Sequence, residues 1–141
     1  MTPWPPCDVQ RIEHAVESAE RTTSAELRVH IARTCEGDPR DHATRIFASL
    51  GMHRTAARNG VLIYVAPISR KWAVLGDVGI NSHVPSTFWS ELAHDAVAHF
   101  REEQFTDGIV ELVKRCGETL AASFPREASD INELPDHVSV E

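Results

Sequence analysis

Residues 59–77 read NGVLIYVAPISRKWAVLGD, and this stretch decides the fold. The dipeptide at 59–60 is typical of a turn, and residues 61–66 form an unbroken apolar run of strand length. Such a run suits a central strand that is buried on both faces of a sheet. Residues 72–75 predict a further strand that ends at Gly76-Asp77. The connection between the two strands is so short that they are expected to form an antiparallel hairpin.

The remaining elements extend this hairpin into a layered fold. Residues 26–31, ELRVHI, alternate between polar and apolar and predict a half-buried strand. A predicted helix, in which apolar residues recur at helical spacing, separates this strand from residues 61–66. The two strands are therefore expected to be parallel and joined by a right-handed crossover. The predicted helices cover residues 8–21, 38–50, 88–104 and 107–124. The element order α-β-α-β-β-α-α predicts the α/β class, as a three-layer-like sandwich with a small mixed sheet.

Composition restricts the possible functions. The chain has 141 residues and a net charge of −7, which argues against a nucleic acid or an anionic membrane surface as the main partner. The three cysteines, Cys7, Cys35 and Cys116, form no CxxC pair and are expected to be reduced. Neither a signal peptide nor an apolar run of membrane-spanning length is present. These features predict a soluble protein that stays in the cytoplasm.

The two ends of the chain differ in composition from the middle. Residues 1–7 are proline-rich and predict a flexible arm, and residues 8–125 predict a single domain. Residues 126–141 carry five acidic side chains and predict a solvated acidic tail that contributes little to the core. The apolar residues Ile131, Leu134 and Val138 leave the alternative of a docked strand or a short partner-binding segment.

The predicted topology brings three polar residues together. The hairpin places Asp77 beside Asn59, and the parallel pairing places Glu26 at the same edge of the sheet. Two carboxylates and an amide oxygen suit a hard divalent cation, calcium or magnesium, through which a phosphate can bind with help from Arg28 or Arg58. The alternative is structural, because Asn59 tolerates a left-handed turn conformation and Asp77 can cap its loop.

Other kinds of catalytic site are disfavoured by residue spacing. The eight histidines lack the spacing of a zinc site, which makes calcium the more fitting metal. The sequence also contains no nucleophile elbow and no glycine-rich phosphate or dinucleotide loop. The residues alone therefore identify no activated catalytic group and no organic cofactor.

Several segments, in the right order over residues 9–138, resemble the TPM domain family, the group with thylakoid lumen and MOLO members. They are TTSAELRVH (22–30), RNGVLIYV (58–65), GDVGI (76–80), FW (88–89) and FP (124–125). The tail DINELPD (130–136) resembles the ending of the short, soluble bacterial members. The resemblance implies an α/β sandwich with a small mixed sheet, in agreement with the pattern of strands and helices.

The resemblance also implies a site and two classes of function. It singles out Glu26 of Thr-Ser-x-Glu-x-Arg, Asn59 of Arg-Asn-Gly and Asp77 of Gly-Asp-x-Gly-Ile. Some members of the family bind calcium-type metals, a plant member resembles acid phosphatases in activity, and others are similar to assembly factors for membrane complexes. Many relatives carry a signal peptide and a C-terminal membrane helix, which are not seen in this sequence.

Two hypotheses follow. The first is a non-catalytic interaction or assembly module that binds a protein partner, with a divalent cation as its only expected cofactor. The second is a metal-dependent, phosphatase-like hydrolase that acts on phosphate monoesters. The acidic tail favours the first, and the paired carboxylates at one edge of the sheet favour the second.

Overall fold

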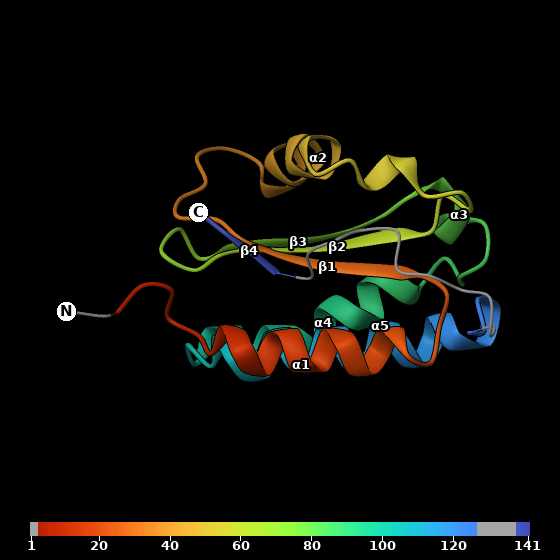
Figure 1. Cartoon of the computed structure of the whole chain (residues 1–141). Coiled ribbons are helices and arrows are strands. Elements are labelled where there is room, and N and C mark those ends of the chain that lie inside the picture. Colours follow the sequence, from red (N-terminus) through yellow and green to blue (C-terminus); the bar gives the residue numbers. More distant parts are fainter. Residues whose placement is uncertain (1–2, 127–137) are drawn as a thin grey trace.

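The computed structural model describes residues 3–126 and 138–141, which fold into three layers (Figure 1). The sheet is the middle layer, and α2 (Pro39–Ser49) covers one of its faces. On the other face lie α1 (Val9–Glu20), α4 (Phe88–Arg101) and α5 (Phe105–Ser123). This arrangement confirms the predicted three-layer α/β sandwich.

The sheet has the order β3-β2-β1-β4 among the described residues. Its strands are β1 (Glu26–Ile31), β2 (Gly60–Ala66), β3 (Lys71–Gly76) and β4 (Val138–Val140). β1 and β2 are parallel with Glu26 opposite Gly60, and β2 and β3 are antiparallel with Val61 opposite Gly76. The parallel pairing of β1 with β2 and the antiparallel hairpin are therefore as predicted from the sequence.

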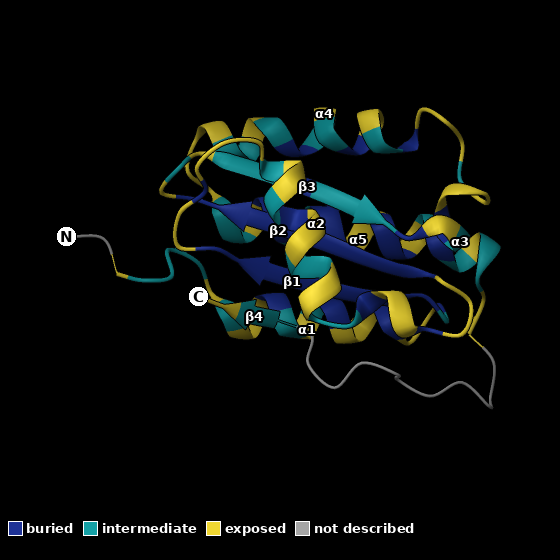
Figure 2. Ribbon diagram, turned by 90° about the horizontal axis from the view of Figure 1, so that it is seen from above, coloured by how far each residue is buried: buried dark blue, intermediate teal, exposed yellow. Residues whose placement is uncertain are grey.

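β2 is buried on both faces, as its unbroken apolar run predicts (Figure 2). Val61, Ile63 and Val65 belong to the core beneath α1, α4 and α5. The alternate residues Leu62, Tyr64 and Ala66 belong to a smaller core beneath α2. Since successive side chains of a strand point to opposite faces, β2 joins the two cores.

The helix bounds follow from recognisable capping groups. Asp8 and Asp38 accept hydrogen bonds from the backbone N–H groups of Arg11 and Arg40 at 3.2 Å and 2.8 Å, which fixes the starts of α1 and α2. α5 begins at Phe105, two residues before the predicted start. Two short elements, η1 (Met52–Arg54) and α3 (Val78–Asn81), were not predicted because they are too short to show helical periodicity.

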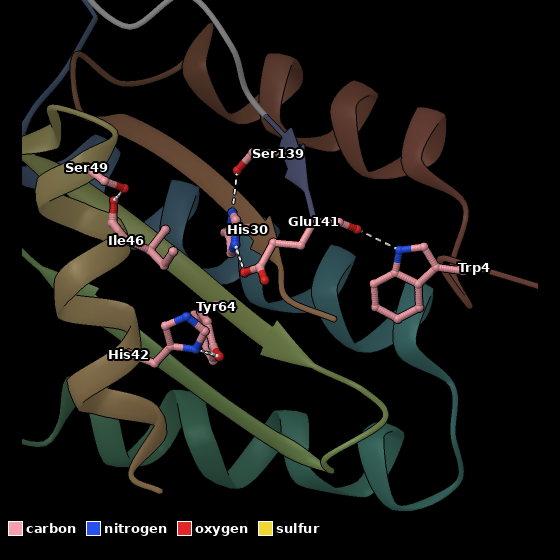
Figure 3. A network of polar contacts seen from close by, with 8 residues as sticks. All are labelled: Trp4, His30, His42, Ile46, Ser49, Tyr64, Ser139 and Glu141. Atoms are coloured by element: carbon pink, nitrogen blue, oxygen red, sulfur yellow. Dashed lines mark hydrogen bonds and ion pairs between the residues drawn. The ribbon is translucent and has the colours of Figure 1, made fainter. Parts of the chain in front are cut away.

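The prediction of a wholly solvated acidic tail is wrong for its last residues. Val138 to Val140 form β4, which pairs in parallel with β1. His30 on β1 contacts this strand through both ring nitrogens, Nδ1 to Ser139 Oγ at 2.7 Å and Nε2 to Glu141 Oε2 at 2.7 Å (Figure 3). The alternative of a docked strand at Val138 is therefore correct, because the outer edge of β1 offers backbone groups for pairing. Residues 127–137, with Ile131 and Leu134, lie outside the described residues.

The proline-rich arm is also held in place over residues 3–7. The indole Nε1 of Trp4 donates a hydrogen bond to the backbone oxygen of Glu141 at 2.8 Å (Figure 3). The guanidinium of Arg33 lies 4.7 Å from the centroid of the Trp4 ring, which is a cation–π arrangement. Trp4 and Cys7 pack against the larger core. The packing of Trp4, which lies between Pro3 and Pro5, and of Cys7, which follows Pro6, explains why this part of the arm departs from the expected flexible conformation.

We predict that deletion of residues 138–141 destabilises the fold measurably. The deletion removes the pairing with β1 and leaves the buried His30 ring without Ser139 and Glu141. Each lost hydrogen bond contributes about 1 kcal/mol, so the free energy of unfolding is expected to fall by about 2 kcal/mol or more in urea denaturation. The control Ser139→Ala loses only one of these bonds and is expected to fall by about 1 kcal/mol. An unchanged midpoint in the deletion variant would show that β4 contributes nothing.

Candidate functional site

The rim, defined here as the edge of the sheet where β1 and β2 begin and β3 ends, brings together all three residues singled out from the sequence. The backbone N–H of Glu26 donates to the carbonyl of Asn59 at 3.2 Å, and the N–H of Asp77 donates to the carbonyl of Gly60 at 2.9 Å. The three residues are buried, with exposed fractions of 3%, 3% and 6% for Glu26, Asn59 and Asp77. Their convergence is as predicted from the strand topology.

Asp77 is held by Arg58 in a two-pronged ion pair. Arg58 Nε lies 2.8 Å from Asp77 Oδ2, and Nη2 lies 2.9 Å from Oδ1. The same Oδ1 accepts a hydrogen bond from the N–H of Val78 at 2.7 Å, so Asp77 also caps α3. The Asp77 side chain is 4% exposed and the Arg58 side chain is 48% exposed. A fixed, buried carboxylate is therefore covered by a guanidinium that reaches it from the solvent side.

Gly79 allows the loop after Asp77 to lie against residues 57–58. Its N–H donates to the carbonyl of Arg58 at 2.9 Å. A Cβ at this position would lie 2.2 Å from the carbonyl oxygen of Ala57 and 2.6 Å from that of Arg58. Only glycine permits so close an approach, which explains the glycine of the Gly-Asp-x-Gly-Ile segment.

Asn59 connects the rim to the chain that enters β1. Its Nδ2 donates to the carbonyl of Ser24 at 3.1 Å, which orients the amide group. The buried Oδ1 finds no hydrogen-bond donor within the described part of the chain. An unsatisfied buried acceptor costs about 1–3 kcal/mol, so a hydrogen-bond donor or a cation at this oxygen would be stabilising. The left-handed conformation expected of Asn59 belongs instead to Arg58, whose φ is 50°.

Glu26 forms a carboxyl pair that the sequence did not indicate. Its side chain is hydrogen-bonded to that of Glu20, the last residue of α1. Burial, followed by the hydrogen bond to Glu26 and the charge of Glu26, raises the pKa of Glu20 from 4.5 to about 8. The Glu20–Glu26 pair is therefore expected to keep a proton near neutral pH. Only the packing of α1 against β1 brings these two residues together, so the sequence alone did not predict that Glu20 belongs to the rim.

The side chains of Asp77, Glu26 and Asn59 lie at the same rim, but each forms its hydrogen bonds with a different residue. Asp77 pairs with Arg58, Glu26 with Glu20, and the Asn59 amide donates to Ser24. Across residues 3–126 and 138–141, no group of three or more His, Cys, Asp and Glu side chains is arranged to hold a metal ion. The rim as described is thus a set of adjacent polar pairs with one buried acceptor oxygen, Asn59 Oδ1, that lacks a hydrogen-bond donor among the described residues.

The sequence of the chain matches that of a known protein family. The sequence model of the TPM domain matches residues 6–119, most of the chain. The chain belongs to the TPM domain family. No curated protein matches it. The match does not distinguish the thylakoid lumen group from other members, so that subgroup stays a prediction.

Two solved structures resemble this TPM domain. The NMR structure of the BA42 protein from the psychrophilic bacterium Bizionia argentinensis has 35% sequence identity and a TM-score of 0.89, over 100% of both chains. The solution structure of the N-terminal domain of the cg2496 protein from Corynebacterium glutamicum has 15% identity and a TM-score of 0.64. This second likeness covers 92% of this chain and 80% of the other, and it shows the fold alone.

Two further expectations concern the thiols and membranes. Cys7, Cys35 and Cys116 are free, and burial raises the pKa values of Cys7 and Cys116 to about 11 and about 12, so these two thiols are protonated and poorly nucleophilic. Within the described segments, none of the helices has the length and apolar character to cross a membrane. A cytoplasmic location stays a prediction.

We predict that Glu20 makes the stability of this TPM domain depend on pH. Between pH 4.5 and about 8 the folded protein holds a proton on Glu20 that the unfolded chain releases. The free energy of unfolding therefore falls as pH rises through this range, by at most about 1.4 kcal/mol per pH unit from this group.

The variant Glu20→Gln keeps a donor toward Glu26 and cannot titrate, so its free energy of unfolding is expected to vary less with pH. The measurement is urea denaturation of both proteins at intervals from pH 4.5 to 8.5. Glu118→Gln, on an exposed position of α5, is the matched control and should keep the wild-type slope. Identical slopes for all three proteins would show that Glu20 titrates normally.

Proposed function

We propose that this TPM domain is a non-catalytic interaction module whose rim responds to a divalent cation. The observation that supports the proposal is the Arg58–Asp77 pair, in which a half-exposed guanidinium covers a buried carboxylate. Asp77 is fixed by the end of β3 and by the N–H of Val78, whereas Arg58 reaches the pair from the solvent side. A divalent cation can therefore replace the guanidinium without rearrangement of the sheet.

The available donors at the rim are oxygen atoms. Asp77 offers a carboxylate, Asn59 offers its unsatisfied Oδ1, and the surrounding loops offer carbonyls. Hard cations such as calcium and magnesium prefer this donor set, and zinc prefers histidine and cysteine. Glu26 is a weaker candidate ligand, because its carboxylate accepts the proton of Glu20.

Release of Arg58 changes the surface that the rim presents. Val78, which follows Asp77, is 62% exposed at the start of α3, so a guanidinium released from Asp77 would add a positive charge close to an exposed apolar side chain. A positive charge beside an exposed apolar side chain suits a protein partner that offers a carboxylate beside an apolar residue. In this proposal the cation exposes the binding surface and the module carries out no chemistry itself.

We expect calcium or magnesium to stabilise the wild-type protein through Asp77. At 100 times the dissociation constant, binding contributes about 2.7 kcal/mol, which is seen as a rise in melting temperature relative to the same protein in chelator. Arg58→Gln removes the competing cation and is expected to show a larger rise at equal cation concentration. Asp77→Asn is expected to show none.

The quantity compared is the difference in melting temperature between cation and chelator for each variant. This difference is needed because Asp77→Asn also breaks the Arg58 pair and lowers the stability of the cation-free protein. Asp107→Asn is the matched control, since Asp107 pairs with Arg11 at 3.1 Å on another part of the surface. Equal rises in melting temperature for the wild type and for Asp77→Asn would show that Asp77 does not bind the cation.

A metal-dependent, phosphatase-like hydrolase is the second candidate, and the Glu20–Glu26 pair favours it. A carboxylic acid that stays protonated at neutral pH can serve as a general acid for a leaving group. The test is hydrolysis of a generic phosphate monoester with calcium, magnesium or chelator. Turnover that is lost in both Glu20→Gln and Asp77→Asn would establish the hydrolase and overturn the interaction module. We expect no turnover above the buffer.

A further inference from the structure

A pocket lies at the end of the sheet opposite the rim. It has a volume of about 280 Å³ and lies between the turn that joins β2 to β3 and the loop that joins α4 to α5. Its walls include the aromatic residues Trp72, Phe100 and Phe105, together with Val65. The rings of Trp72 and Phe100 are 5.2 Å apart and inclined by 55°. These side chains form a flat-sided apolar surface of the kind that binds an aromatic ring.

The mouth of this pocket is positively charged although the chain as a whole is acidic. Arg70, Lys71 and Arg101 line it, against a single acidic residue, Glu103. The net charge of the whole chain is −7, so this local excess of cations reverses the general trend. Lys71 Nζ donates to the carbonyl of Gly37 at 2.6 Å, which directs its charge toward the loop before α2 and leaves Arg70 and Arg101 as the cations at the mouth. The mouth therefore favours an anionic group on the ligand.

Two residues at the mouth have a left-handed backbone conformation. Arg70 has a φ of 55° and closes the β2–β3 turn, and Glu103 has a φ of 60° and follows the end of α4. Glycine is the favoured residue at both kinds of position, because a side chain is strained there. Here both positions carry charged side chains, and these meet as Arg70 Nη2 and Glu103 Oε1 at 3.2 Å.

An exposed ion pair of this kind adds little stability, so it does not account for two strained residues in place of glycine. Strained backbone that persists at the opening of a pocket is a feature of binding sites. The charges of Arg70 and Glu103 are thus better explained by what they do at the mouth than by their effect on the fold.

We propose that this pocket binds a small aromatic carboxylate. The ring of the ligand lies against Trp72 and Phe100, and its carboxylate is bound by Arg70 and Arg101. Arg101 has no acidic partner among the described residues, and Arg70 is free to exchange Glu103 for the ligand because their pair is exposed to solvent. The volume of about 280 Å³ lies just below the range for ligand pockets, about 300–1,000 Å³, which restricts the ligand to one or two fused rings. The proposal is independent of the function proposed for the rim.

The test is calorimetric titration of the full chain with indole-3-acetate and with indole-3-acetamide, its uncharged counterpart. We expect the carboxylate to bind at least tenfold more tightly than the amide. Arg101→Gln is expected to weaken binding of the carboxylate about tenfold and to leave binding of the amide unchanged. Arg21→Gln, at the end of α1, is the matched control and should bind both compounds as the wild type does.

Arg70→Gly separates binding from folding. Glycine relieves the left-handed strain, so the melting temperature of this variant is expected to equal or exceed that of the wild type, while its affinity for the carboxylate falls about tenfold. Equal affinity for the acid and the amide, or wild-type affinity in both arginine variants, would overturn the proposal. Absence of binding at about 10 mM indole-3-acetate, a free energy weaker than about −3 kcal/mol, would also overturn it.

Discussion

The burial of β2 on both faces is the constraint on which the rest of the structure depends. Its backbone groups pair with β1 on one side and β3 on the other, and its side chains alternate between the two cores. A strand in this position needs helices above and below it, which explains the three layers. It also aligns the start of β1 with the end of β3 and so creates the rim. Both the fold and the candidate site therefore follow from residues 60–66.

The rim shows how polar residues at one edge of the sheet are stabilised once they are buried. Asp77 and Glu26 are buried, and each is stabilised by a neighbour that is close only in the folded chain, Arg58 for one and Glu20 for the other. A buried carboxylate needs such a partner or a proton, and the two halves of the rim use these two solutions. The difference has a chemical consequence, because a fixed guanidinium covers Asp77, whereas the proton held by the Glu20–Glu26 pair can be lost to solvent as the pH rises.

Much of the fold could be predicted because its signals are local. The apolar run of β2, the alternation of β1 and the caps at Asp8 and Asp38 each lie within a few residues, and topology then placed Glu26, Asn59 and Asp77 at one edge. The partners of those residues could not be predicted. Glu20 reaches Glu26 only through packing of α1, and the apolar residues of the tail allowed a docked strand at Val138 without indicating that its partner is β1. Contacts of this kind depend on the assembled fold.

The pairing of β4 with β1 also has a consequence for the order in which the fold forms and opens. His30 and Ser139 are 109 residues apart in the chain, so this contact closes a far longer loop than the β2–β3 hairpin does. Contacts of long sequence separation form late and add few interactions per residue when the strand is short. β4 is therefore expected to detach before the rest of the sheet unfolds, as a separate unit of low local stability. The backbone amides on the outer edge of β1 exchange with solvent through that local opening, whereas the amides of β2 exchange only when the whole domain unfolds.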